Sequence, residues 1–237
     1  MNIALVLAGG TGTRLGAPIP KQFVEVNGNP VIAYTLSALQ NHPAIERIQV
    51  VAVSPWEKKV TEYARLYGIS KFSGTVESGQ TRYLSTRRGM ESLGDVADDD
   101  IIIVHDSVRP LVTAESLTDV IAVCRKYGNS MSVTDCTDTM YERTTQNATA
   151  REAERDKLVS GQTPEAVSGR RMREMYAAAD KKNICLDSVS ALQLRLGWQV
   201  HFAHGSKRNI KITRAEDIEL FRALMGTKTD YKKSSKF

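Results

Sequence analysis

The chain has 237 residues, of which 41% are hydrophobic and 25% charged, a balance that suits a globular protein with one sizeable core. The net charge of +5 owes much to four lysines after Gly226, and we interpret residues 227–237 as a solvated basic tail rather than a nucleic-acid arm. No apolar run approaches the ~20 residues of a membrane span, and three scattered cysteines favour free thiols in a reducing, cytoplasmic compartment.

Short apolar runs alternate with helical patterns along most of the chain, which is typical of an α/β protein. The first predicted strand covers residues 3–7 and leads into a glycine-rich loop that ends at Gly16. Further strands are predicted at residues 48–53, 72–76, 101–104 and 131–133, and helices at residues 31–40, 57–66 and 80–93. Because the strands are continuously apolar, we expect a Rossmann-like, mostly parallel sheet with helices on both faces.

Two later helices carry start signals, and a polar segment lies between them. Thr113 can cap one helix, and Thr213-Arg-Ala-Glu216 has the form of a capping box for the last one. Residues 135–161 are polar and poor in large apolar side chains. A polar excursion of this length is usually functional or disordered, and we predict a protruding arm within a single domain of residues 1–237.

The loop after the first strand can place backbone N–H groups around a phosphate, because glycines let the chain approach a ligand closely. The spacing of Gly10, Gly12 and Gly16 is one residue longer than a dinucleotide fingerprint, and the loop has no Gly-Lys-Ser/Thr ending of a P-loop. Arg14 and Lys21 add two cations suited to the charge that develops in phosphoryl transfer. A tight loop that holds no ligand is the alternative interpretation.

Several motifs follow one another at characteristic distances. They are Leu7-Ala-Gly-Gly-Thr-Gly-Thr-Arg14, Pro20-Lys-Gln22, Gly79-Gln-Thr-Arg82-Tyr-Leu-Ser85, His105-Asp-Ser-Val-Arg-Pro110, Asp138-Thr139, Gln162-Thr-Pro164 and Asn209-Ile-Lys211-Ile-Thr213. Together they resemble the small CTP-dependent cytidylyltransferases of ribitol 5-phosphate and of 2-C-methyl-D-erythritol 4-phosphate. The resemblance extends from Leu7 to Asp217 and implies a nucleotide-diphospho-sugar transferase fold with a protruding β-arm.

The resemblance also implies roles for individual residues. Nucleotide contacts are implied for Leu7, Ala8, Gly9, Gly10, Gly12, Thr13, Gly79, Gln80, Arg82, Ser85 and Ser107. Catalytic roles are implied for Arg14, Lys21, Arg155 and Lys211. Asp106, Arg109 and Thr139 would hold the acceptor. Asp106 is also the one candidate ligand for a Mg²⁺ ion that the CTP phosphates would mainly carry.

In this family the arm crosses to a second subunit, so Arg155 would serve the neighbouring active site and the chain would form a homodimer by arm exchange. Arg151 competes with Arg155 for that role, and Asp106 with Arg109 could instead form a purely structural ion pair. We interpret His105 as a structural residue, because an acceptor phosphate is already ionised at neutral pH and its oxygen needs no general base.

The implied reaction is transfer of CMP from CTP to a small polyol phosphate, with release of pyrophosphate. Leu7-Ala-Gly-Gly10, Ser107 and Ser160-Gly-Gln-Thr-Pro164 favour D-ribitol 5-phosphate as the acceptor. Asp187-Ser-Val-Ser-Ala-Leu192 instead resembles the 2-C-methyl-D-erythritol 4-phosphate enzymes, and Leu186 departs from the Thr usual in both groups. The alternative acceptor is therefore 2-C-methyl-D-erythritol 4-phosphate.

Two other classes of protein compete with this interpretation. The first is a dinucleotide-dependent oxidoreductase, against which the long glycine loop and its two cations count. The second is a non-catalytic nucleotide-binding or nucleic-acid-associated protein, for which the basic tail is the main support.

Overall fold

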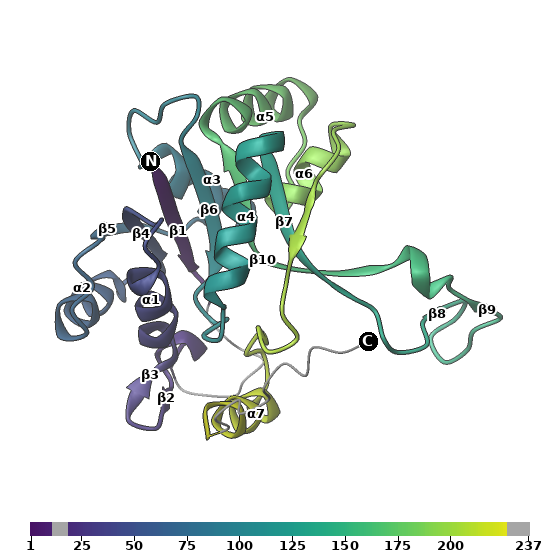
Figure 1. Ribbon diagram of the computed structural model, residues 1–237, viewed down its shortest axis with the longest axis horizontal. Helices are drawn as coiled ribbons and strands as arrows, with labels where there is room; N and C mark the ends of the chain where they lie inside the picture. The colour runs from purple at the N-terminus through teal and green to yellow at the C-terminus, as the bar shows by residue number, and fades with distance from the viewer. Residues whose placement is uncertain (11–18, 227–237) are drawn as a thin grey trace, which may run out of the picture.

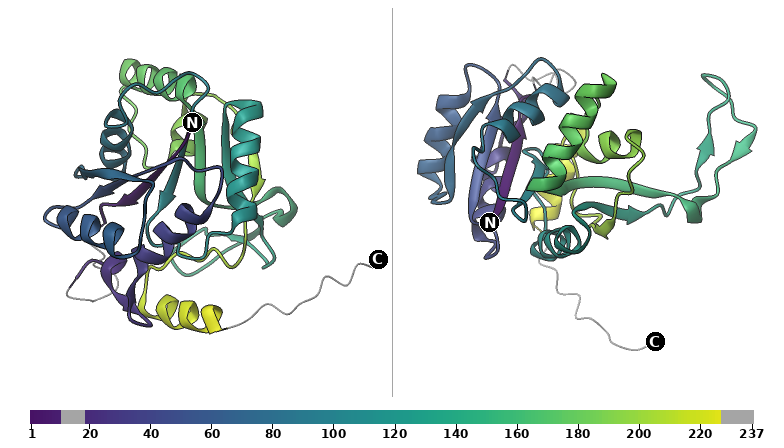
Figure 2. Two further views of the ribbon diagram at one scale, coloured as in Figure 1. Left: turned by 60° about the vertical axis from the view of Figure 1, so that its left-hand side comes forward. Right: turned by 90° about the horizontal axis from the view of Figure 1, so that it is seen from above.

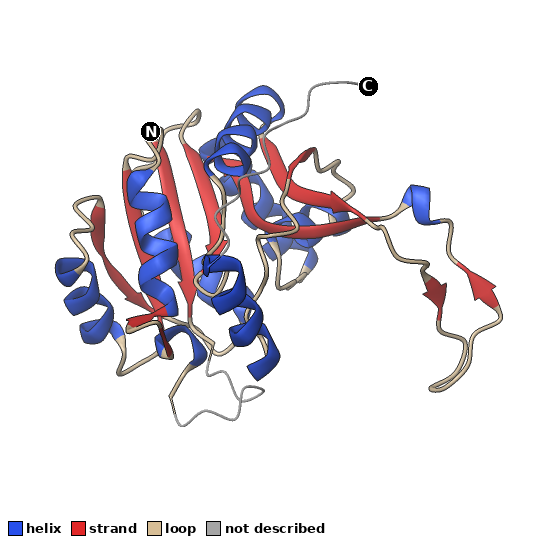
Figure 3. Ribbon diagram, turned by 60° about the horizontal axis from the view of Figure 1, so that its bottom comes forward, coloured by secondary structure: helices blue, strands red, loops and turns tan. Residues whose placement is uncertain are grey.

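The computed structural model describes residues 1–10 and 19–226, which form an α/β body with one projecting arm (Figure 1). The central sheet has the order β11 (Phe202–His204), β7 (Asn129–Asp135), β10 (Val159–Ser168), β6 (Ile101–Asp106), β1 (Asn2–Ala8), β4 (Arg47–Ala52) and β5 (Phe72–Glu77). Within this sheet β10 runs antiparallel to β6 and β7, and the other neighbouring strands are parallel (Figure 3). The predicted mostly parallel sheet is confirmed.

Both faces of the sheet are covered by helices, because successive side chains of each strand point to opposite faces. Along β1, Ala4 and Val6 pack into one apolar cluster with α1 (Val31–Asn41), α2 (Glu57–Leu66) and α4 (Ala114–Tyr127). Ile3 and Leu5 pack into the opposite cluster with α3 (Arg82–Glu91), α5 (Gly169–Lys182) and α6 (Val189–Arg195). This double burial explains why the strands are apolar at consecutive positions.

A smaller cluster attaches the C-terminal helix to the body. Phe221 of α7 (Ala215–Gly226) is fully buried and contacts Tyr34 of α1 edge-on, at 5.1 Å between ring centroids. Val26, at the end of the short strand β2 (Glu25–Val26), lies in the same cluster, and β2 pairs with β3 (Asn29–Pro30). The helix therefore closes over the segment that follows the glycine loop.

The helix start signals have different outcomes. Thr113 caps α4 as predicted, because its side chain accepts a hydrogen bond from the Ser116 amide. The capping box at Thr213 and Glu216 is wrong. The Asp217 carboxylate accepts from the amides of Thr213 and Arg214, at 2.7 and 2.8 Å, so the acid that satisfies the free N–H groups stands one residue later.

Three elements, β10, α5 and α6, had no clear pattern in the sequence and were not predicted. The strand β10 includes Thr163 and Glu165, both buried, and its pairing with β7 shifts register between Gln162 and Glu165. Polar residues at buried positions and an irregular ladder remove the continuous apolar pattern by which the other strands were found. Each unpredicted helix begins after a serine cap, Ser168 for α5 and Ser188 for α6.

The arm leaves the body between two neighbouring strands and extends away from the sheet (Figure 2). Asp135 at the end of β7 pairs with Val159 at the start of β10, so the segment between them forms a closed excursion. It contains the paired strands β8 (Tyr141–Glu142) and β9 (Arg151–Glu152) and the 3₁₀ helix η3 (Arg155–Lys157). Within residues 1–10 and 19–226, no helix combines the length and apolar character needed to span a membrane.

Candidate active site

A cavity of about 360 Å³ opens at the carboxyl ends of β1 and β6, where parallel sheets commonly bind ligands. Four chain segments and one isolated lysine surround it. The lining residues are Leu7, Gly9, Gly10, Lys21, Gln22, Gly79, Gln80, Thr81, Arg82, Ser85, Asp106, Ser107, Val108 and Lys211. Residues far apart in the sequence therefore meet in one pocket, as the motifs predicted.

Two of the glycines are required by close packing. A Cβ atom at Gly9 would lie 2.6 Å from the Ser78 Cβ, and one at Gly79 would lie 2.4 Å from the Leu84 Cβ. Both distances are too short for real side chains, so Gly9 can pack against Ser78, and Gly79 against Leu84, only because they have no Cβ atom. The wall built by the ends of β1 and β5 consequently presents backbone rather than side chains to the cavity.

Gln22 holds the start of the glycine loop, at Ala8 and Gly10, in place. Its buried side-chain amide donates to the carbonyl oxygens of Ala8 and Gly10, at 2.7 and 2.9 Å. Gln22 stands in the 3₁₀ helix η2 (Lys21–Phe23), directly after Lys21. The Lys21 ammonium donates to the carbonyl oxygen of Ile212 at 2.8 Å and lines the cavity.

Ser85 organises the turn that precedes α3. The Thr81 side chain caps this helix by accepting from the Leu84 amide. The Ser85 hydroxyl donates to the Thr81 carbonyl oxygen at 2.8 Å and accepts from the Gly79 amide at 3.1 Å. This local network fixes residues 79–85 against the cavity before any ligand is present.

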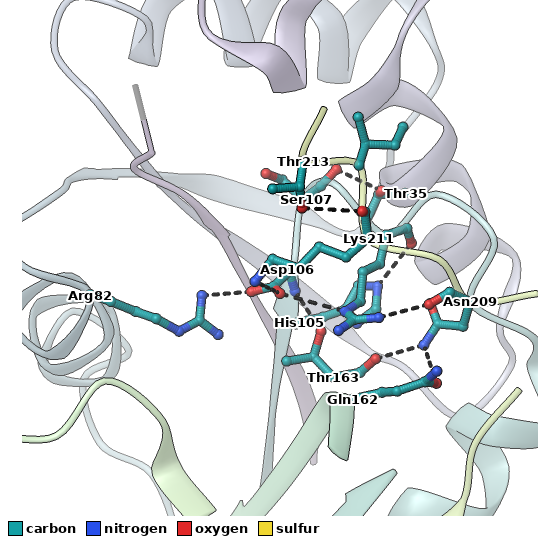
Figure 4. A network of polar contacts seen from close by, with 12 residues as sticks. Thr35, Arg82, His105, Asp106, Ser107, Gln162, Thr163, Asn209, Lys211 and Thr213 are labelled. Carbon is teal, nitrogen blue, oxygen red and sulfur yellow. Dashed lines mark hydrogen bonds and ion pairs between the residues drawn. The ribbon is translucent and has the colours of Figure 1, made fainter. Parts of the chain in front are cut away.

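Asp106 is the centre of a charged cluster on the cavity wall (Figure 4). One of its carboxylate oxygens is 2.6 Å from Arg82 Nη1, and the other is 2.9 Å from Lys211 Nζ and 3.5 Å from Arg109 Nε. Burial alone would raise the pKa of this carboxyl, but Arg82, Lys211 and Arg109 hold the pKa below its ordinary value. A single carboxylate among three cations leaves excess positive charge, which suits a polyanionic ligand.

His105 lies beneath this cluster and is fully buried. Burial lowers its pKa to about 4, so the imidazole is neutral at pH 7. Its Nε2 is 3.2 Å from the Arg109 carbonyl oxygen, and its Nδ1 has no hydrogen-bond partner among the described residues. This geometry supports the structural interpretation, because neither nitrogen is exposed to the cavity.

The structure places most of the predicted nucleotide-site residues at the cavity. Ala8 is buried next to it and contributes its carbonyl oxygen to Gln22. Gly12, Thr13 and Arg14 lie outside the described residues. Arg82 lines the cavity, but its guanidinium is paired with Asp106 and its Nε donates to the Asp187 carbonyl oxygen at 3.1 Å.

The predicted acceptor residues divide between two places. Arg109 is not among the cavity-lining residues, because its largely buried guanidinium donates to the Asn209 carbonyl oxygen at 2.7 Å. Thr139 and Arg155 lie on the arm, where they line a separate hollow of about 520 Å³ with Glu152 and Lys157. The chain therefore brings Thr139 and Arg155 together, but away from its own cavity (Figure 1).

The donor groups around the cavity do not form a metal cage. Both oxygens of Asp106 already contact cations, so this carboxylate is not free to ligate Mg²⁺ in this arrangement. Within the described residues, no group of three or more His, Cys, Asp or Glu side chains is arranged to hold a metal ion. The predicted metal role of Asp106 is therefore not supported by its surroundings.

Sequence reasoning assigned no role to several residues that shape the site. Gln22, Thr163 and Asn209 each stand within a recognised motif, and each hydrogen-bonds the backbone or side chain of another motif. Their signal was present, since buried amides and hydroxyls in a motif indicate polar partners. The partners themselves could be identified only from the folded structure.

Comparisons with known proteins agree with this geometry. The family model described as 2-C-methyl-D-erythritol 4-phosphate cytidylyltransferase (IspD) matches residues 2–227. A ribitol-5-phosphate cytidylyltransferase of Lacticaseibacillus paracasei is 36% identical over 232 residues, covering 96% of this chain and 99% of that protein. A 2-C-methyl-D-erythritol 4-phosphate cytidylyltransferase of Syntrophus aciditrophicus is 33% identical, covering 94% of this chain and 95% of that protein.

Solved structures of similar proteins share the fold. The crystal structure of 4-diphosphocytidyl-2C-methyl-D-erythritol synthase from Anaerococcus prevotii superposes with a TM-score of 0.81. It is 26% identical in sequence, and the match covers 95% of this chain and 96% of that one. The sheet, the covering helices and the projecting segment therefore belong to an architecture that has been solved before.

Proposed function

Because this chain belongs to the 2-C-methyl-D-erythritol 4-phosphate cytidylyltransferase (IspD) family, we propose that it transfers CMP from CTP to D-ribitol 5-phosphate, forming CDP-ribitol and pyrophosphate. The chain is a cytidylyltransferase. The observation that carries the proposal is the cavity that joins the glycine loop, Lys21 and Lys211 at the carboxyl ends of the strands. The choice of ribitol is supported by the relative with 36% identity over nearly the whole of both chains.

The chemical step is an in-line displacement at the α-phosphorus of CTP. A phosphate oxygen of the acceptor forms the new P–O bond, and the bond to the β-phosphate bridging oxygen breaks, so pyrophosphate leaves. The ammonium groups of Lys21 and Lys211 would stabilise the negative charge that builds up on the phosphoryl oxygens. Arg14 would add a third cation from the glycine loop.

Nucleotide recognition would use the backbone wall at Gly9 and Gly79. With glycine at both positions the two segments pack tightly, and the Ser85 network fixes the turn that faces the base. A preorganised site of this kind stabilises the bound state without a large reorganisation on binding. Mg²⁺ would arrive on the CTP phosphates, since the described side chains offer no carboxylate set for it.

The acceptor site would be completed by a second subunit. Thr139 and Arg155 lie together on the arm and distant from the cavity of their own chain. We propose that the arms of a homodimer exchange, so that each Arg155 reaches the acceptor phosphate in the partner's cavity. The three cysteines are unpaired, as we expect of free thiols in a cytoplasmic protein.

The second candidate acceptor is 2-C-methyl-D-erythritol 4-phosphate, which is favoured by the family model and by the relative with 33% identity. A pyrophosphate-release assay with CTP and Mg²⁺ should compare the two polyol phosphates side by side, with mass spectrometry of the product. We expect a higher kcat/KM with D-ribitol 5-phosphate. A preference for methylerythritol phosphate would reverse the acceptor assignment, and no release with either compound would refute both.

A further inference from the structure

Asn209 is a fully buried residue that connects two parts of the site (Figure 4). Its side-chain amide donates two hydrogen bonds, to the Thr163 carbonyl oxygen at 2.8 Å and to Gln162 Oε1 at 3.2 Å. Its own carbonyl oxygen accepts from Arg109 Nη1 at 2.7 Å. One residue thus contacts β10 through its side chain and the Asp106 cluster through its backbone.

The contact on β10 lies at the irregular point of that strand. The pairing of β10 with β7 shifts between Gln162 and Glu165, so the Asn209 amide fills the place where the regular ladder is interrupted. The Thr163 hydroxyl accepts from the Asp106 amide at 3.1 Å on the other side of the same residue. The position of Asn209 is therefore coupled to the backbone that carries Asp106.

The contact of the Asn209 carbonyl oxygen with Arg109 also couples Asn209 to the Asp106 cluster. Lys211 follows Asn209 by two residues and contacts Asp106 at 2.9 Å. Fixing the Asn209 backbone therefore fixes both Arg109 and Lys211, which approach the same carboxylate oxygen of Asp106. The Gln162 amide extends this network by donating to the Ser206 carbonyl oxygen at 3.1 Å.

We propose that Asn209 is a positioning residue that sets the acceptor end of the active site. Its side-chain amide anchors the loop of residues 205–213 to the root of the arm, and its carbonyl oxygen orients Arg109. The inference rests on the proposed function, in which the Asp106 cluster faces the polyol phosphate. It extends that function by linking the place where the arm joins the sheet to the cation cluster of the same chain.

Replacement of Asn209 should impair the kinetics with the acceptor rather than the affinity for CTP. The nucleotide wall is held by Gln22, Thr81 and Ser85, and the hydrogen bonds of these residues stay within the segments next to the glycine loop and α3. Loss of the Asn209 amide leaves those bonds intact. A merely structural role would instead weaken both substrates together or reduce only the stability of the fold.

Asn129 is a matched control at the opposite end of the sheet. It is also fully buried, and its amide also donates to a glutamine oxygen and to a backbone carbonyl, at 2.7 Å to Gln193 Oε1 and 2.9 Å to the Gln199 oxygen. It is the first residue of β7, whereas the arm follows the last residue of that strand, and Asn129 does not line the cavity. Its replacement removes a similar network without touching the Asp106 cluster.

The test compares Asn209→Ala, Asn129→Ala and Gln162→Ala in the full chain. Thermal unfolding is measured first for each variant. Steady-state kinetics with ribitol 5-phosphate and CTP affinity by calorimetry are then measured at a temperature where all variants are folded. For Asn209→Ala we expect kcat/KM for the acceptor to fall about tenfold, as for loss of a buried hydrogen-bond donor, with the CTP Kd changed less than about twofold. Gln162→Ala should show a smaller loss of the same kind, and it tests the proposal if Asn209→Ala does not fold.

The outcomes separate this proposal from the proposed function. Wild-type protein that turns over no polyol phosphate would remove the function itself. Wild-type turnover with unchanged acceptor kinetics in both Asn209→Ala and Gln162→Ala would overturn the positioning role alone. So would an equal acceptor defect in Asn129→Ala, or a CTP affinity that weakens in parallel with the acceptor kinetics in Asn209→Ala.

Discussion

The cavity and the arm differ in burial: the cavity is lined largely by buried or half-buried groups, whereas the arm is exposed to solvent. The cavity wall is made of buried backbone and paired charges, and its residues come from segments as distant as Leu7 and Lys211. By contrast, every residue from Thr137 to Glu152 on the arm is exposed, and β8 and β9 pair through only two residue pairs. The arm therefore has no apolar core of its own, and its ion pairs, such as Arg151 with Glu142, lie in solvent.

Of these two regions, the cavity is preorganised by its own chain and the arm is not. The exposed side chains Met140, Tyr141 and Leu158 leave apolar surface on the arm that nothing in the body covers. In the proposed homodimer the arm would gain its order from a partner surface, whereas the cavity keeps its shape through internal hydrogen bonds. Substitutions in the two regions should therefore differ in size and in whether a second subunit can compensate for them.

The largest effect is expected inside the cavity, from Lys21→Ala. Loss of a positioned cation at the transferring phosphoryl group should lower kcat about 10²- to 10³-fold, as for other charge-stabilising groups. Lys59→Ala, which removes an exposed lysine paired with Glu62 on α2, serves as the control and should leave kcat unchanged. Initial rates of pyrophosphate release with saturating substrates measure both. Near-wild-type kcat in Lys21→Ala would remove Lys21 from the proposed mechanism.

An intermediate effect is expected on the arm, from Arg155→Ala, and it should be recoverable in trans. The variant alone should lose about 10- to 100-fold in kcat/KM for the acceptor, because a charge-assisted contact to the phosphate is lost. Mixed with inactive Lys21→Ala and allowed to exchange subunits, it should recover about a quarter of wild-type activity, since half of the dimers then carry one intact site.

This mixing experiment distinguishes the two regions directly. In a mixed dimer, the cavity of the Arg155→Ala chain is intact and receives the unaltered arm of the Lys21→Ala chain. An equal mixture that is no more active than the sum of its parts would contradict arm exchange. Size-exclusion chromatography with light scattering on the same samples reports whether mixed dimers can form at all.

The smallest effect is on stability and concerns the floor of the cavity. The pKa of His105 is about 4 in the folded protein, below its ordinary value of 6.5, because burial disfavours the charged imidazole. Between these values the unfolded chain binds more protons, so the free energy of unfolding falls as the pH drops below 6.5. The loss between pH 7 and pH 5 should be about 2 kcal/mol for this group.

The histidine contribution can be isolated by comparing variants. His105→Gln can still donate to the Arg109 carbonyl oxygen but does not titrate, so urea unfolding should show a weaker pH dependence than wild type. Glu142→Ala, on the arm, should retain the wild-type dependence from pH 5 to pH 7. An unchanged slope in His105→Gln would show that the imidazole is not buried in its neutral form.

The sequence predicted the central parallel strands of the fold better than the strand that carries buried polar residues. Continuous apolar runs identified β1, β4 and β6, because strands covered on both faces are apolar at every position. Such a pattern could not identify β10, where Thr163 and Glu165 are buried polar residues that accept hydrogen bonds from the Asp106 and Ser190 amides. Burial of polar groups depends on partners that are distant in sequence.

The site shows the same limit. The motifs placed Lys21, Ser85 and Lys211 at one cavity, since each carries a chemistry that ligands require. They did not reveal that Arg82 and Lys211 both pair with Asp106, because that cluster forms only when three separate segments meet. For residues that connect motifs, such as Asn209, the sequence gives the residue type but not the hydrogen-bond partners.

The pairing of Asp135 with Val159 has a practical consequence for engineering. Because the two ends of the arm are adjacent partners in one ladder, residues 136–158 form an insertion whose removal leaves β7 and β10 side by side. A foreign arm would need only to meet those two positions, whatever its length between them. Grafting the corresponding segment of a methylerythritol-phosphate enzyme onto this body would then exchange Thr139 and Arg155 without rebuilding the nucleotide pocket.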